Sequence, residues 1–580
     1  MPANPTWRDI VESARADAPD QVAFTFLGSA SEGDIACTYR ELSDAARAIA
    51  AHLVAAGLAG ERAVLLYPPG PDYVRALLGC LYAGVTAVPV YAPRPNASYA
   101  RIEQVLASAD AAVLLSSQRT LDTLATTEWG RPIAARARWL ATDAIDAADA
   151  HAWTETPLDA GTLAVLQFTS GSTGTPKGVM LEHRHLVTNS RMIQRAMDCT
   201  PADVGVIWLP PYHDMGLIGG LLQPMYTRCP VWLMSPYTFL QRPLRWLDVM
   251  TRVGGSISSA PNFAYELCAS RVRPDQLAAL DLSAWRLAAN GAEPVRADTL
   301  RRFADAFAPA GFRASAFFPC YGMAETTLYV SGATPGAGAR VLAAERASLG
   351  QGQVRAAAPD AADALPLVSS GRPDPDTRVV IVDADSGAPL PAGAIGEILV
   401  QGETVAAGYW RRPADSATTF DARIDGEPGS WLRTGDLGAL VDGELYVTGR
   451  IKEMIIVRGA NHYPHDIEAT LADLPDGQRP RGAAAFALDA GDGEGLGLVV
   501  ELDRHQLAAD PAPLAAAIRD AVAREHQLQI VRLAFVRPGG IPRTSSGKTQ
   551  RRLARERLLA GELALASPPA NDFELEGSLA

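Results

Sequence analysis

The feature that most constrains the fold is a regular alternation of helical and strand patterns in the first part of the chain. Residues 41–56 carry apolar side chains at helical spacing and end at a glycine, and the short apolar run 63–67 ends at Pro-Pro-Gly. A second helical pattern and a second strand pattern follow at 73–83 and 87–91, and similar alternation returns between residues 204 and 307. This rhythm predicts a layered α/β architecture with mostly parallel strands.

The length of the chain requires more than one domain, because a single hydrophobic core does not grow to 580 residues. The pattern restarts near residue 451 with short strands and helices, which favours a small C-terminal α+β domain. We therefore expect an N-terminal domain over residues 1–450 and a second domain over residues 451–580. Residues 333–367 are rich in Ala, Gly and Pro and weakly patterned, so they are predicted to form an insertion.

Charge and cysteine content argue against several classes of protein. A net charge of −13 disfavours a nucleic-acid binder that is held by phosphate contacts. The six cysteines are dispersed without a C-x-x-C pair, so neither a disulfide framework nor a zinc site is expected. We find no apolar run that is long enough to span a bilayer and no signal-peptide pattern at the N-terminus, so we expect a cytoplasmic protein without a membrane span.

The segment 162–178 joins an apolar strand to a loop of hydroxyl groups and glycines. Glycines permit positive φ, so successive backbone N–H groups in such a loop can point into one concavity, and hydroxyls and a lysine add further donors. The pattern predicts a polyphosphate cradle and differs from a Walker A loop because glycine follows the lysine. A flexible Ser/Gly loop is the alternative. The residues of the predicted cradle are Thr169, Ser170, Gly171, Ser172, Thr173, Gly174 and Lys177.

Lysine is rare in this sequence, and its positions are informative. Only Lys177, Lys452 and Lys548 occur among 52 basic residues, so arginine supplies nearly all the positive charge. An ammonium is a compact point charge whereas a guanidinium is a wide fork, so these three lysines favour sites that only a compact cation fits. Chance placement is the alternative. Lys548 lies in the segment 541–549 (IPRTSSGKT), in which Pro542 excludes a Walker A loop.

Together these segments resemble the ANL superfamily of adenylate-forming enzymes, and the resemblance covers essentially the whole chain. That superfamily includes acyl-CoA synthetases, nonribosomal adenylation domains and luciferases. Each further motif is weak alone, but their order along the chain makes the match strong. The motifs are 210–216 (PPYHDMG), 290–294 (NGAEP), 321–326 (YGMAET), 432–436 (LRTGD) and 449–453 (GRIKE).

Within the superfamily the chain is most similar to the fatty acyl-AMP ligases. Residues 236–246 and 459–468 resemble theirs, and 333–367 matches the position of their characteristic insertion. In that family the insertion is associated with disfavouring free CoA, and the acyl group goes to the phosphopantetheine arm of an acyl carrier protein. The resemblance therefore implies a fatty acid as substrate, ATP and Mg²⁺ as cofactors, and a holo-acyl carrier protein, or a polyketide or nonribosomal carrier domain, as partner.

The resemblance also implies roles for residues at the reaction centre. Lys548 would swing in with the C-terminal domain and bridge the carboxylate, the α-phosphate and the ribose, and Lys452 would be the hinge between the two domains. Thr326 would contact the α-phosphate and Glu325 would serve Mg²⁺. His213 matches a family residue near the carboxylate, with a structural histidine that caps a turn as the alternative.

A further set of residues is implied to hold the nucleotide. The phosphates would lie in the cradle described above, an aromatic ring and small residues would enclose the adenine, and a carboxylate and a guanidinium would hold the ribose. These residues are Tyr321, Gly291 and Ala292 for the adenine, Gly322 for the nucleotide as a whole, Asp436 for the ribose hydroxyls, and Arg450 for the ribose or a phosphate.

The acyl chain needs an apolar tunnel, for which segments 217–225, 231–239 and 260–267 are candidates, although each equally fits an ordinary core. Three other functions stay open. An acyl-CoA synthetase would make acyl-CoA readily, and a non-catalytic nucleotide- or lipid-binding regulator would bind ATP without reacting. An amino-acid adenylation domain is disfavoured because no carrier or condensation segment follows the C-terminal domain. Joint retention of Lys548 and Glu325 with the nucleotide residues argues against a regulator.

Overall fold

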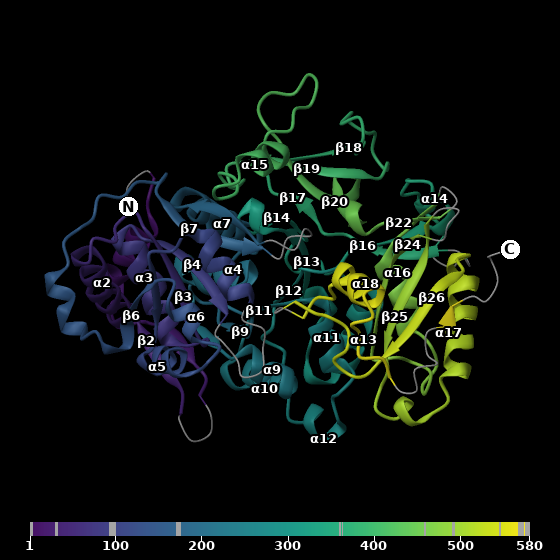
Figure 1. The fold of residues 1–580 in the computed structure, drawn as a ribbon, viewed down its shortest axis with the longest axis horizontal. Coiled ribbons are helices and arrows are strands. Elements are labelled where there is room, and N and C mark those ends of the chain that lie inside the picture. Colours follow the sequence, from purple (N-terminus) through teal and green to yellow (C-terminus); the bar gives the residue numbers. More distant parts are fainter. Residues whose placement is uncertain are drawn as a thin grey trace.

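The computed structural model describes residues 4–28, 33–91, 100–169, 176–358, 361, 364–457, 460–489, 494–544, 547–566 and 573–574. In Figure 1 the purple and blue N-terminal part lies on one side and the yellow C-terminal part on the other, with the teal strands β11 to β13 between them. No helix in these ranges combines the length and the apolar character that a bilayer crossing requires.

A six-stranded sheet forms one layer of the N-terminal part, in the order β6-β5-β3-β4-β7-β8. Every pairing in it is parallel except that of β7 with β8, so the expected mostly parallel arrangement is confirmed. The elements of this layer are β3 (Arg62–Tyr67), β4 (Thr86–Tyr91), β5 (Val113–Ser116), β6 (Arg138–Ala141), β7 (Leu163–Thr169), β8 (Lys177–Glu182), α2 (Tyr39–Ala55), α3 (Pro71–Ala83), α4 (Ala100–Ala109) and α5 (Gln118–Thr126).

Local signals in the sequence explain where these helices begin and end. The Thr38 hydroxyl accepts a hydrogen bond from the Glu41 N–H at 3.2 Å, and the Glu41 carboxylate accepts one from the Thr38 N–H at 2.8 Å, which is a capping box at the start of α2. Helix α3 begins with Pro71 and ends at Ala83, and its C-cap is Gly84, whose φ of 66° lies in the left-handed region.

A nine-stranded sheet forms the second layer, in the order β17-β14-β13-β12-β11-β9-β10-β1-β2. Its central strands are parallel, and β2, β14 and β17 are antiparallel at the two ends. Its elements are β1 (Val22–Phe26), β2 (Ile35–Thr38), β9 (Gly205–Ile207), β10 (Val231–Leu233), β11 (Ile257–Ala260), β12 (Leu287–Asn290), β13 (Phe317–Gly322), β14 (Tyr329–Gly332), β17 (Arg372–Pro373), α1 (Trp7–Asp17), α7 (His183–Ala196), the π-helix η3 (Met215–Leu222), α8 (Gln223–Thr227), α9 (Pro236–Gln241), α10 (Leu244–Val253), α11 (Asn262–Ala269) and α13 (Ala297–Phe307).

The motifs recognised in the sequence follow the carboxyl ends of parallel strands in this second sheet. The segment 210–216 comes after β9, 291–294 after β12, and 323–326 after β13. The carboxyl ends of parallel strands share one edge of a sheet, so three segments that are far apart in the sequence meet there.

The predicted insertion contains regular structure, although the sequence pattern there is weak. Strand β15 (Val341–Glu345) pairs with β16 (Ala364–Val368), and α14 (Arg346–Gly350) lies between them in the chain. Ala344, Leu349 and Val354 share one small apolar cluster with Ala439 of the adjacent antiparallel sheet. That sheet consists of β18 (Thr377–Val382), β19 (Gly396–Gly402), β20 (Leu432–Val441) and β21 (Glu444–Arg450), with α15 (Pro413–Phe420) between β19 and β20.

The C-terminal part has its own hydrophobic cores. Two apolar clusters draw all their buried members from residues 455–566, and we propose that the domain boundary lies at residues 450–451. The elements of this part are β22 (Ile455–Val457), β23 (Ala460–His462), α16 (Pro464–Ala472), β24 (Gly482–Asp489), β25 (Glu494–Glu501), α17 (Pro511–His526), β26 (Ile530–Val536), α18 (Arg551–Leu559) and β27 (Phe573–Glu574).

Candidate active site

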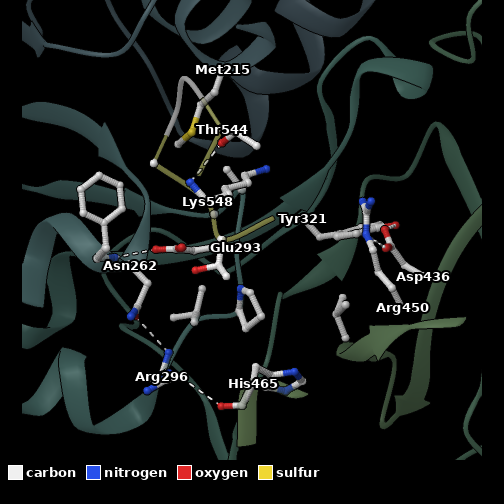
Figure 2. Close-up of a pocket in the computed structure, with 18 of the residues that line it drawn as sticks. Met215, Asn262, Glu293, Arg296, Tyr321, Asp436, Arg450, His465, Thr544 and Lys548 are labelled. Atoms are coloured by element: carbon white, nitrogen blue, oxygen red, sulfur yellow. Dashed lines mark hydrogen bonds and ion pairs between the residues drawn. The ribbon is translucent and has the colours of Figure 1, made fainter. Parts of the chain in front are cut away.

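A cleft of about 2830 Å³ separates the N-terminal sheets from the C-terminal domain. It is bordered by the segments that follow β9, β12 and β13, by strands β20 and β21, and by the loop between β26 and α18. Polar contacts join the two domains across it. The Arg296 guanidinium donates to the His465 carbonyl at 3.1 Å, and Arg302 lies 3.8 Å from Asp473. Figure 2 shows the first of these contacts below Glu293 and Lys548.

Lys548 reaches into this cleft from the C-terminal domain. Its N–H donates to the Thr544 hydroxyl at 3.0 Å, and its carbonyl accepts from the Thr544 N–H at 2.8 Å, so a tight turn presents the side chain. Burial lowers the pKa of Lys548, while the nearby carboxylates of Asp214 and Glu293 oppose this effect. Figure 2 shows the lysine beside Glu293, next to Met215.

His213 and Asp214 are in contact at the start of the π-helix. The His213 Nδ1 lies 2.6 Å from the Asp214 Oδ1, which also accepts a hydrogen bond from the Met215 N–H at 2.6 Å. Burial raises the pKa of Asp214, but His213, Lys548 and the Met215 N–H outweigh it and bring the pKa to about 2. Asp214 is therefore a fixed negative charge that faces Lys548. The sequence motif contains this residue, but it was not among the predicted site residues.

Tyr321, Asp436 and Arg450 are joined in one network on another side of the cleft. The Tyr321 hydroxyl donates to Asp436 Oδ2 at 2.7 Å, and the Arg450 Nε lies 2.7 Å from Asp436 Oδ1. The charge of Asp436 raises the pKa of Arg450, which stays cationic. Figure 2 shows the three side chains together, apart from Lys548. The Arg450 guanidinium and the Tyr321 phenol therefore hold the Asp436 carboxylate in a fixed position, with its oxygens as hydrogen-bond acceptors.

In the part of the cleft that is predicted to receive adenine, two glycines lie very close to the backbone of neighbouring segments. A Cβ on Gly291 would lie 2.9 Å from the Cys320 carbonyl oxygen, and one on Gly322 would lie 1.6 Å from the Leu328 carbonyl oxygen. Ala292 between Gly291 and Glu293 adopts a φ of 69°, which is uncommon for a residue with a side chain. These residues form a tightly packed wall with little side-chain volume.

Replacing Gly322 by alanine is expected to destabilise the N-terminal domain by about 1–3 kcal/mol, because the added Cβ overlaps the Leu328 carbonyl oxygen and the backbone has to shift to accommodate it. We expect a lower thermal unfolding temperature together with weaker ATP binding by calorimetry. Gly350→Ala is the matched control, since a Cβ there would meet nothing within 4 Å. Equal unfolding temperatures for the two variants would show that the wall is not tightly packed.

Glu325 and Lys177 lie in a second network around Tyr409, and Thr326 follows Glu325 in the chain. The Tyr409 hydroxyl donates to Glu325 Oε1 at 2.8 Å, and the Lys177 ammonium lies 4.9 Å from the centre of the Tyr409 ring. Burial raises the pKa of Glu325 despite this hydrogen bond. The Thr326 hydroxyl is fully buried and donates to the Met323 carbonyl at 2.9 Å.

Lys177 is paired in this structure. Its ammonium lies 2.8 Å from Asp415 Oδ1, at the start of α15. Thr169 and Lys177 face each other in the register of β7 and β8, so they flank the predicted phosphate cradle. Ser170, Gly171, Ser172, Thr173 and Gly174 lie outside the described residues. Lys452 lies in a short 3-10 helix, Ile451–Glu453, between the cores of the two domains, and it borders the cleft.

Sequence reasoning missed Tyr409 and Asp415. Both lie far along the chain from the motifs whose side chains they contact, and neither belongs to a motif that we identified. Within the described ranges, no group of three or more His, Cys, Asp or Glu side chains could hold a metal ion by itself.

Comparison with known proteins identifies the family. A model of the AMP-binding enzyme family matches residues 11–410, and one of the Disco-interacting protein 2-like AMP domain matches residues 452–567. The medium-chain-fatty-acid–acyl-carrier-protein ligase JamA of Moorena producens is 40% identical over 550 residues, 93% of each chain. The long-chain-fatty-acid–AMP ligase FadD26 of Mycobacterium marinum is 36% identical, and the match covers 93% of this chain and 94% of that protein.

A solved structure agrees with this result. The fatty acyl-adenylate ligase from L. pneumophila, in complex with acyl adenylate and pyrophosphate, is similar with a TM-score of 0.76 and 35% identity, and the match covers 99% of this chain and 98% of that one. The chain therefore belongs to the AMP-binding enzymes of the ANL superfamily and, within it, to the fatty acyl-AMP ligases.

Proposed function

We propose that this protein activates a fatty acid with ATP to give acyl-adenylate and pyrophosphate, and then transfers the acyl group to the phosphopantetheine thiol of an acyl carrier protein. The observation that carries the proposal is the position of Lys548 beside Asp214 and Glu293, on the border between the cleft and an apolar pocket. That pocket is lined by His213, Met215, Phe263 and Leu240, among others. A cation at this border can meet a carboxylate and a phosphate together.

The first step joins two anions, so its barrier depends on stabilising charge. An oxygen of the fatty acid carboxylate attacks the α-phosphorus, and the bond to the β-phosphate oxygen breaks as pyrophosphate leaves with the electron pair. In the proposal, Lys548 stabilises the charge that develops on the α-phosphate oxygens. Tyr321, Gly291, Ala292 and Gly322 enclose the adenine, and Asp436 accepts hydrogen bonds from the ribose with Arg450 beside it.

The residues around Glu325 fit a magnesium ion that is shared with ATP. Mg²⁺ is bound through one or two carboxylates together with substrate phosphates and water, so a single protein carboxylate suffices. The Glu325 carboxylate is buried and has a raised pKa, so a nearby cation would offset the cost of its charge. Bound there, Mg²⁺ would neutralise phosphate charge. Thr326 and the predicted cradle from Thr169 to Lys177 would orient the phosphates.

The second step is a thioester transfer, in which the thiol sulfur attacks the acyl carbonyl, AMP leaves and the thiol gives up its proton. Two observations support a carrier protein rather than free CoA as acceptor. JamA acts on an acyl carrier protein. The second is the insertion, which in the fatty acyl-AMP ligases is associated with disfavouring free CoA. Here the segment 333–367 contains ordered structure against β20, and Arg346 within it lies 3.7 Å from Glu525 of the C-terminal domain.

A parallel product assay tests the proposal. Labelled fatty acid and ATP are incubated with the protein, and either CoA or a phosphopantetheinylated carrier protein is added. We expect acyl-adenylate in both reactions, acyl-carrier in the second and little acyl-CoA in the first. Rapid formation of acyl-CoA would instead identify an acyl-CoA synthetase. ATP binding without any adenylate would identify a regulator.

The pH dependence of adenylation is expected to report the charge of Lys548. Asp214 raises the pKa of Lys548, so Asp214→Asn should lower it further. Lys548 loses its proton, and with it its charge, as the pH rises through this pKa. The alkaline limb of the pH profile of kcat/KM, where activity falls, should therefore lie at lower pH in the variant. Asp476→Asn, at an exposed surface ion pair, is the control. An unchanged limb in Asp214→Asn would contradict the assignment.

A further inference from the structure

The cleft continues into the N-terminal domain along one face of the π-helix η3 and helix α8. Met215, Gly219 and Gln223 follow one another at four-residue intervals, and all three border the cleft, which places them on one helix face. Met215 lies at the end next to Lys548 (Figure 2). At the helical rise per residue, Gln223 lies on the order of 10 Å further along.

The walls of this part of the cleft are apolar. They are formed by side chains from the end of α7 and its C-cap, from β9, and from the residues at the start of β14, and we call this part the inner arm. Its walls are Ile193, Met197, Ile207, Leu328 and Tyr329. A Cβ on Gly219 would lie in contact with Leu328 Cδ2, at 3.4 Å, so glycine leaves this part of the arm wider than a larger residue would. An arm with apolar walls fits an extended hydrocarbon chain.

The far end of the inner arm is polar. Gln223 is 5% exposed, and neither its Nε2 nor its Oε1 has a partner at hydrogen-bonding distance and angle. The Cys199 thiol lies close enough to the Gln223 side chain to interact with it: burial raises the pKa of the thiol, and this contact lowers it by a smaller amount. A thiol is a weak hydrogen-bonding partner, and by distance and angle it satisfies neither amide atom. The Thr227 hydroxyl is already used, since it donates to the Gln223 carbonyl at 3.0 Å.

A buried amide without a partner is costly, and such groups are rare in proteins unless a ligand or water completes them. Leucine or methionine at this position would extend the apolar wall without that cost. The presence of glutamine at the end of an apolar arm therefore points to a polar group on the molecule that fills the arm.

We propose that Gln223 recognises a hydroxyl group at the far end of the acyl chain, so that the preferred substrate is an ω-hydroxylated acid. The inference rests on the proposed function, because it concerns the acid that enters that site. An amide offers both a donor and an acceptor, which matches a hydroxyl that also donates and accepts. A terminal methyl group would leave both amide atoms unpaired, and a terminal carboxylate would bring a charge among neutral walls.

A substrate series tests this inference on the full-length protein. Adenylate formation is measured as kcat/KM by pyrophosphate release, for ω-hydroxy acids and for unsubstituted acids with the same numbers of carbons. We expect the hydroxy acid to be preferred at the chain lengths that bring its hydroxyl to Gln223, by about 10-fold or more, as for a site with a buried hydrogen-bonding group. A preference for unsubstituted acids at every length would overturn the inference.

Three variants sharpen the test. Gln223→Leu should lower the ratio of hydroxylated to unsubstituted substrate by about 10- to 100-fold, because the amide is lost. It should also unfold at the same temperature as the wild type or higher. Gln223→Asn shortens the side chain, so the preference should return for a longer hydroxy acid. Thr227→Val removes a hydroxyl that already has a partner and should leave the ratio unchanged.

The outcomes separate this inference from the proposed function. If Gln223→Leu changes kcat/KM for both acids by the same factor, Gln223 has only a structural role and the inference fails, while adenylate formation still supports the proposed function. If no acid of either series gives adenylate, the proposed function fails and the inference fails with it.

Discussion

Replacing Lys548 by alanine is expected to lower the rate of acyl-adenylate formation by about 10²- to 10³-fold, the usual cost of losing a well-placed charge-stabilising group. Lys548 lies in the cleft beside Asp214 and Glu293, at its border with the apolar pocket. We expect kcat to fall more than the affinity for ATP, because the interaction strengthens as charge develops in the transition state. Fatty-acid-dependent ATP–pyrophosphate exchange and calorimetric ATP binding measure the two effects.

Two further variants separate the position of the charge from its presence. Lys548→Arg keeps the charge but replaces a compact ammonium by a wide fork, so we expect most of the activity to be lost. Arg552→Ala removes one positive charge at an exposed contact with Glu556 and should leave exchange unchanged. Exchange at the wild-type rate in Lys548→Ala would remove the basis of the proposed function.

Replacing Lys452 by proline is expected to block the second half-reaction while sparing the first. Lys452 lies in a 3-10 helix at the proposed domain boundary, and proline fixes φ near the value of such a helix. The structure has Lys548 in the cleft, which is the arrangement proposed for adenylation. A locked hinge would hold this arrangement and slow acyl transfer by about 10²-fold or more, as for other misplaced reacting groups.

The two half-reactions are measured separately, by pyrophosphate exchange and by transfer of the acyl group from preformed acyl-adenylate to the carrier protein. Lys452→Ala is the matched control, because it removes the same side chain without fixing φ, and it should retain both activities. If Lys452→Pro slows both half-reactions equally, the residue is structural, and if it slows neither, the hinge lies elsewhere.

Periodic patterns predicted much of the fold, because burial on one face leaves a regular trace in the sequence. Helices α2 and α3 and strands β3 and β4 lie close to their predicted bounds. The insertion was harder to predict, because its few buried residues belong to a small cluster that Ala439 of another sheet completes. Its strands are stabilised by contact with a residue that is far away in the sequence.

The sequence predicted the site residues that belong to recognised motifs. It did not predict the residues that only tertiary contacts bring to the site. The segments that contain Glu325, Asp436 and Lys548 were identified by resemblance, and all three residues border the cleft. Tyr409 and Asp415 were missed because a lone tyrosine or aspartate has no signature. Segment 217–225 divides between core and cleft, with Leu217 buried in the core and Gln223 on the inner arm, because helix geometry assigns neighbours to different faces.

The contacts between the domains have a consequence for how the two half-reactions respond to ionic strength. Arg302–Asp473 and Arg346–Glu525 are partly exposed pairs at 3.8 and 3.7 Å, so dissolved ions screen them. Added salt would weaken these pairs and shift the population of molecules away from the arrangement that has Lys548 in the cleft. The ratio of the rate of adenylate formation to the rate of acyl transfer would then depend on the salt concentration.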